Sequence, residues 1–152
     1  MAYTSAEARQ DLIDALAEAI EHIGFALADL GAAYEQLDEH NAELLETELF
    51  APVQRAYGRA KSTHAKFADR HGLASRTFEA PPPGIPSTSV HAFIDGAVRS
   101  VSEADSALSE LQDSSLPTEV GDTELRAALT DVRELLSGVR LRARDLERTL
   151  GR

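Results

Sequence analysis

Residues 5–37 read SAEARQDLIDALAEAIEHIGFALADLGAAYEQL, and this stretch decides the fold class. Its large apolar side chains recur at intervals of three and four residues, which places them on one face of an α-helix. They are Ile13, Leu16, Ile20, Ile23, Leu27, Leu30, Tyr34 and Leu37. Thr4 followed by Glu7 fits a capping box, so we predict that a helix begins near Ser5.

Small residues flank this apolar face on both sides. Ala17, Gly24 and Gly31 lie on one flank, and Ala19, Ala26 and Ala33 lie on the other. Small flanks allow two neighbouring helices to approach closely, so we expect this helix to lie between two companions. Phe25 falls on the outward face and is a candidate interface residue.

Three further stretches show helical periodicity, and none alternates as a β-strand does. The predicted helices cover about 5–45, 49–72, 88–112 and 121–150. Prolines 81, 82, 83 and 86 predict a Pro-rich connection at 73–87, between the second and third helices. The fold predicted for residues 1–152 is therefore a single all-α domain, a four-helix up-down bundle with a long N-terminal helix.

The phase of the apolar pattern breaks between the first two predicted helices. Continuing the first pattern would place Glu48, Arg55 and Ser62 in the core, so we expect a turn between about Asn41 and Pro52. A helix that continues and kinks at Pro52 is the alternative.

Composition limits the function classes. The chain has 152 residues, no cysteine and a net charge of −11. Disulfides and thiolate metal sites are excluded, and DNA and anionic membranes would be repelled. No secretory signal is visible, so a cytoplasmic location is expected. Arginine outnumbers lysine thirteen to two, which suggests a GC-rich bacterial genome.

The charges also suggest how helices pair. In an up-down bundle the first and last helices are antiparallel neighbours. Arg126, Arg133 and Arg140 recur along one flank of the last helix. We expect them to lie over the small flank of the first helix and to face the acidic residues beside it, Asp14, Glu21 and Glu35.

Five polar residues interrupt the apolar faces of the first two helices: Tyr34, Asn41, Tyr57, His64 and His71. In an antiparallel hairpin Tyr57 would meet Asn41 and His64 would meet Tyr34. Such a layer would set the register of the two helices. Alternatively, an imidazole beside a phenol forms a ligand pocket or a proton-transfer site.

A metal site is not predicted, because dinuclear sites in helical bundles need Glu-x-x-His motifs and this chain has none. The nearest pattern, Glu18 with His22, lies on the outer face of the first helix. No cofactor is predicted either.

The segment Arg59-Ala-Lys-Ser-Thr-His64 resembles the Arg-x4-His motif of the HEPN ribonucleases. The resemblance implies that Arg59 and His64 would act on an RNA backbone, often across a dimer. The motif covers six residues, the polar residue that usually follows the arginine is replaced by Ala60, and the acidic charge disfavours RNA as a partner.

The function predicted from the sequence is that of a non-catalytic helical interaction or scaffold protein. Its expected partner is a second copy, as a homodimer, or another helical protein. A small-ligand-binding bundle or weak enzyme using Tyr34, Tyr57 and His64 is the first alternative, and the HEPN-like ribonuclease is the second.

Overall fold

The computed structural model describes residues 4–82 and 89–151, which are mostly helical and contain no β-strand. The predicted all-α bundle with a long N-terminal helix is confirmed. The helices are α1 (Ser5–Glu35), α2 (Glu39–Leu45), the π-helical segment η1 (Glu46–Phe50), α3 (Ala51–Arg70), α4 (Val90–Asp113), α5 (Leu116–Glu119), α6 (Thr123–Leu136) and α7 (Val139–Leu150). None of the described helices is long and apolar enough to cross a membrane.

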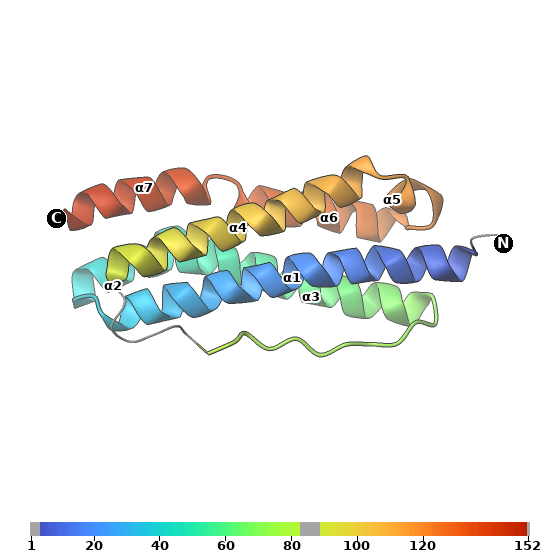
Figure 1. The fold of residues 1–152 in the computed structure, drawn as a ribbon, viewed down its shortest axis with the longest axis horizontal. Helices are drawn as coiled ribbons and strands as arrows, with labels where there is room; N and C mark the ends of the chain where they lie inside the picture. The colour runs from blue at the N-terminus through green and yellow to red at the C-terminus, as the bar shows by residue number, and fades with distance from the viewer. Residues whose placement is uncertain (1–3, 83–88, 152) are drawn as a thin grey trace.

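The contacts between the long helices arrange α1, α3, α6 and α4 as a square. Helices that are neighbours in this square run in opposite directions (Figure 1). Helix α1 packs between α3 and α4, while α6 packs on α3 and α4, and α7 continues along α4. Helices α3 and α4 run in the same direction, so the predicted up-down order of successive helices is wrong. Since α1 packs on α3 and α4, α6 and α7 lie diagonally opposite α1. The prediction that the first and last helices are neighbours is therefore wrong.

Helix α1 begins where the sequence predicts, with the Thr4 hydroxyl accepting a hydrogen bond from the Glu7 N–H at 3.0 Å. It ends at Glu35, ten residues earlier than predicted. After a turn, the Asp38 carboxylate caps α2 by accepting from the Asn41 N–H at 2.8 Å. The turn thus lies at residues 36–38 rather than after Asn41, because Asp38 is a strong N-cap that starts a new helix.

From Glu39 to Arg70 the backbone is helical without interruption, so the second helix has no fresh start at 49. The helix does continue through Pro52, as the alternative expected, but it starts at Glu39 after the turn and is not an extension of α1; η1 ends at Phe50, just before Pro52. A π-helical turn is wider than an α-helical turn, so it relieves the clash of the proline ring with the preceding turn. Ala42, Leu45, Leu49 and Val53 are buried at helical spacing on both sides of η1, so the break in phase lies at the turn between α1 and α2.

The predicted fourth helix is two helices. Helix α6 ends at Leu136, and α7 begins at Val139 after Gly138, whose φ is +81°. The apolar spacing continues across the break, because Leu136 and Val139 are both buried. The pattern therefore did not reveal it.

The small flanks of α1 are buried against neighbouring helices as predicted, except at Gly31, which is partly buried and lines an open groove. Ala17, Ala19, Ala26 and Ala33 are at most 1 % exposed. Gly24 faces α3, where a Cβ atom would be in van der Waals contact with Tyr57, 3.5 Å from its Cε1. These close approaches set the register of α3 on α1.

Residues 73–82 are extended, and we call them the strap. The strap runs along α1 and α3 in Figure 1, in the same direction as α1. It confirms the first part of the predicted Pro-rich connection; residues 83–87 of that prediction lie outside the described residues.

Candidate functional site

The predicted polar layer does not form. Because α1 ends ten residues early, the register of the hairpin differs from the predicted one. Tyr57 meets Gly24 rather than Asn41, and His64 faces Asp14 rather than Tyr34. Tyr34 is 41 % exposed at the end of α1, and Asn41 belongs to the cap of α2.

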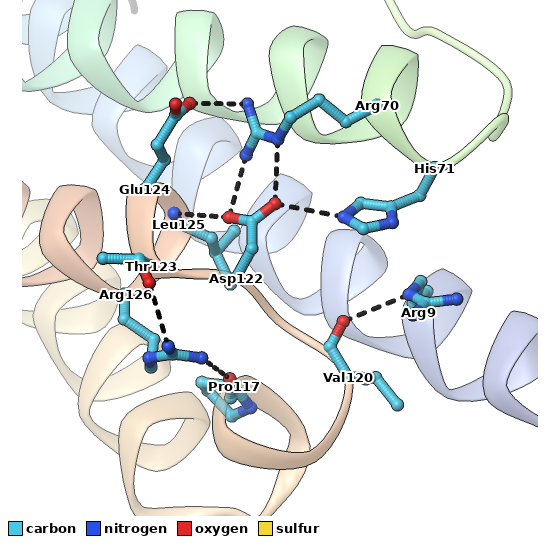
Figure 2. A network of polar contacts seen from close by, with 10 residues as sticks. All are labelled: Arg9, Arg70, His71, Pro117, Val120, Asp122, Thr123, Glu124, Leu125 and Arg126. Carbon is cyan, nitrogen blue, oxygen red and sulfur yellow. Dashed lines mark hydrogen bonds and ion pairs between the residues drawn. The ribbon is translucent and has the colours of Figure 1, made fainter.

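His71 belongs instead to a polar network at one end of the bundle, which we call the clasp (Figure 2). The Asp122 carboxylate caps α6 by accepting from the Leu125 N–H at 2.8 Å. It also accepts two hydrogen bonds from the Arg70 guanidinium, at 2.8 and 2.9 Å, and lies 3.0 Å from Nε2 of His71. Nearby, Arg9 of α1 donates to the Val120 carbonyl at 3.1 Å.

The clasp joins helix ends within the chain. Burial alone would raise the pKa of Asp122, but hydrogen bonds from Arg70, the Leu125 N–H and His71 hold it at about 2. The carboxylate is therefore charged at all ordinary pH values, and its acceptor sites are used within the chain. The network holds the start of α6 against the end of α3.

Arg59 and His64, which carry the resemblance to HEPN ribonucleases, lie on different sides of α3. Arg59 pairs with Asp131 of α6 at 3.1 Å, and His64 packs under the strap. The two side chains do not converge within one chain. The ribonuclease activity stays a prediction, tested by RNA degradation that survives EDTA and is lost in His64→Ala.

A groove between α1 and α3 is the strongest candidate for a binding site, and the strap occupies its first half. The Phe78 ring meets the His64 ring edge-on, with the ring centroids 5.1 Å apart. Arg76 lies over the Phe78 ring at 5.0 Å and pairs with Glu21 of α1 at 3.2 Å. The acidic side of α1 therefore faces the strap rather than the last helix.

His64 is buried beneath the strap, with 2 % of its surface exposed. Its Nδ1 atom has no hydrogen-bond partner in the described part of the chain. Burial and the charge of Arg76 lower the pKa of His64, while Asp14 opposes them. The imidazole is therefore neutral at pH 7.

The second half of the groove is open, with a volume of about 720 Å³. Its lining is mostly apolar and small, with polar groups from Glu35, Gln54 and Lys61 among it. The apolar and small lining residues are Leu27, Ala28, Gly31, Ala32, Phe50, Tyr57, Gly58 and Ala80. A Cβ atom at Gly31 or Gly58 would meet nothing within 4 Å, so these glycines leave free space.

Tyr57 stands where the two halves of the groove meet. Lys61 lies over its ring at 4.1 Å, and burial together with Glu79 of the strap raises the pKa of its phenol. Its hydroxyl therefore stays protonated. At this point Ala80 is close to α1, its Cα being 3.7 Å from the position of a Cβ on Gly24.

A second hollow, of about 590 Å³, lies between α4 and α7 and is lined by both acidic and basic side chains. His91 contacts Glu147 there at 3.2 Å. Burial and the neighbouring Asp95 raise the pKa of Glu147, although His91 opposes them. No group of three or more His, Cys, Asp or Glu in the described ranges is arranged to hold a metal ion.

Phe25 lies on the outward face of α1, 47 % exposed, and its ring contacts that of His22. Arg76, Phe78 and Gly58 also belong to the groove but were not predicted as site residues. Phe78 could have been singled out, since it is the one aromatic residue in the Pro-rich connection at 73–87. Gly58 could have been singled out too, because a glycine inside a helical pattern costs about 1 kcal/mol relative to alanine.

Comparisons of the chain with protein-family models, with curated proteins and with solved structures found no match.

Proposed function

We propose that the chain is a non-catalytic interaction protein whose groove between α1 and α3 binds an extended, apolar segment of a partner polypeptide. One observation carries the proposal: the groove already holds an extended segment, the strap, and continues beyond Ala80 with a mostly apolar lining but without an occupant among the described residues.

The size and chemistry of the open half support an extended segment. Its volume of about 720 Å³ lies within the range of about 300–1,000 Å³ that is typical of binding clefts. An α-helix is about 10–12 Å across with its side chains, whereas an extended segment fits a narrow groove in line with the strap. The polar groups of Gln54 and Lys61 are available to the backbone of such a segment.

The expected affinity is modest. Each medium-sized apolar side chain that is buried contributes about 1.5–3 kcal/mol, and two or three such side chains must offset the cost of ordering the segment. We therefore expect dissociation constants in the micromolar range.

Filling the free space at the glycines tests the proposal. Peptides would be selected from a random library against the full chain and measured by fluorescence anisotropy. We expect apolar peptides whose affinity drops at least tenfold in the Gly31→Leu, Gly58→Leu double variant. Ala65→Leu, on the exposed side of α3, is the matched control and should leave the affinity unchanged.

Two results would contradict the proposal. The library could yield no enriched peptide, or the selected peptides could bind the double leucine variant as tightly as the unmodified chain. Circular dichroism melts would verify that the variants fold, which we expect because both glycine positions are open.

A further inference from the structure

Few contacts hold the strap on the bundle. No backbone–backbone hydrogen bond joins residues 74–82 to the rest of the described chain. Most of its side chains are exposed, and Leu73 and Phe78 are the ones that pack against the core. The ion pair of Arg76 with Glu21 is about half exposed, so water screens it and it holds the strap only weakly. Side chains therefore make the contacts of residues 74–82, and the strap can leave the groove without breaking a backbone–backbone hydrogen bond of these residues.

The groups that face His64 determine how readily its imidazole takes up a proton while the strap covers it. Phe78 covers the ring from the strap, and Arg76 brings a positive charge from the same side. Asp14 faces it from α1 and offsets part of that charge. On α3 itself, the neighbouring Thr63 hydroxyl donates to the Arg59 carbonyl and is not directed at the imidazole.

We infer that the strap is a pH-dependent cover: a proton on His64 releases it, and the groove then extends from its open half to the imidazole. Release removes Phe78 from the ring, withdraws the positive charge of Arg76 and gives the orphan Nδ1 atom access to water. What the released groove binds rests on the function proposed above, whereas the release does not depend on it.

The direction of the pH effect follows from the difference in proton affinity of His64 between the closed and the open state. The closed state disfavours the charged imidazole, and the open state exposes it, with a pKa near the ordinary value of about 6.5. Acidification therefore favours the open state. Since the closed state binds the proton weakly, the ratio of open to closed chains should rise up to about tenfold between about pH 7.5 and 5.5.

A buried thiol would measure this ratio even when the open state is rare. The chain has no cysteine, so Gly24→Cys would place a unique thiol beneath Ala80 of the strap. Its labelling rate with a disulfide reagent, divided by the rate of the exposed Ala65→Cys, reports opening. We expect this normalised rate to rise up to about tenfold from about pH 7.5 to 5.5.

Three variants separate the mechanism from general unfolding. Ala128→Cys, buried in α6, should show no rise over this pH range. With Gly24→Cys, His64→Phe keeps a ring against Phe78 but cannot take a proton, and should abolish the rise. His40→Phe changes an exposed histidine and should preserve it. If His64→Phe does not fold, His64→Gln replaces it.

A constant labelling rate, a rise that persists without His64, or an equal rise at Ala128→Cys would overturn the inference. The affinity of the library-selected peptides, measured at both pH values, should increase with acid. If the strap opens but no peptide binds, the proposed function fails and the pH-dependent cover stands. If the strap does not open and peptides bind with an affinity that is independent of pH, the pH-dependent cover fails and the proposed function stands.

Discussion

Asp122 joins two parts of the chain that are far apart in sequence. It caps α6 and accepts two hydrogen bonds from Arg70 at the end of α3. The carboxylate therefore stabilises the fold in two ways. It accepts from a backbone N–H at the start of α6, which would otherwise lack a partner within the helix, and it forms a bidentate charge-assisted hydrogen bond with Arg70. Removing the side chain loses both.

We expect Asp122→Ala to lower the free energy of unfolding by about 1–3 kcal/mol at pH 7, measured by urea denaturation. The pKa of Asp122 is lowered in the fold, so its contribution is present above pH 3.8 and is lost as the pH falls towards about 2. The difference between the two proteins should therefore shrink in acid.

Glu124→Ala is the control, since Glu124 also accepts from Arg70 but is 74 % exposed. It should change the stability by less than about 0.5 kcal/mol. Equal losses in the two variants would mean that Asp122 is not the centre of the clasp.

At the scale of elements, Pro52 explains an unusual contact between distant helices. In a regular helix the Glu48 carbonyl accepts from the N–H of residue 52, which proline lacks. Here the Glu48 carbonyl accepts from Nε of Arg142 at 2.8 Å. Helix α7 thus supplies the hydrogen bond that the proline removes.

Arg142→Met should remove this hydrogen bond and cost about 0.5–1.5 kcal/mol. In a Pro52→Ala background the same substitution should cost less, because the alanine N–H can donate to the Glu48 carbonyl. Thermal melts of the four proteins form a double-mutant cycle. Additive effects would contradict this account of the contact.

The junction of α6 and α7 requires a left-handed residue. Gly138→Ala should destabilise the protein by about 1–2 kcal/mol, because its φ is +81°. Gly58→Ala should instead stabilise it by up to about 1 kcal/mol, since Gly58 is helical and open. The same substitution, glycine to alanine, should thus change the free energy of unfolding in opposite directions at the two positions, as measured by chemical denaturation. Changes in the same direction would refute the explanation.

At the scale of the whole molecule, the square arrangement decides which charges meet. Arg133 faces α4 and pairs with Asp105 at 2.8 Å, while it also donates to Gln112. Arg140 has no carboxylate partner among the described residues. The arginine flank of the last helix therefore does not reach the acidic residues of α1.

Arg133→Glu should lower the stability by about 0.5–1 kcal/mol, and a second reversal at Asp105 to arginine should restore part of the loss. Arg140→Glu should have little effect. The pair Arg144→Glu and Arg148→Glu, at exposed positions, is the control for net charge. Melting temperatures that fall equally for Arg133→Glu and Arg140→Glu would count against the pairing.

Self-association is a further prediction at this scale. We expect a homodimer or a complex with another helical protein, and Phe25 is the exposed aromatic residue in the middle of α1 that an interface could cover. Analytical ultracentrifugation would test it, with Phe25→Ser as the interface variant. Only monomer at high concentration, with no co-purifying protein, would contradict the prediction.

Local sequence patterns predicted the start of α1, the apolar faces of the helices and the burial of most small residues beside the apolar face of α1. These features depend on spacing along one chain: a side chain's face follows from the helical period, and a cap follows from its neighbours, as at Thr4. The prolines after α3 likewise predicted that this connection is extended.

Which helix faces pack against each other could not be predicted from these local patterns. A turn at residues 36–38 moved the hairpin register, so that Tyr57 and His64 meet Gly24 and Asp14 rather than Asn41 and Tyr34. The strap's choice of groove, and the orphan nitrogen beneath it, depend on contacts between residues distant in sequence. Such contacts differ between arrangements that bury similar apolar faces, so a periodic pattern cannot select one of them.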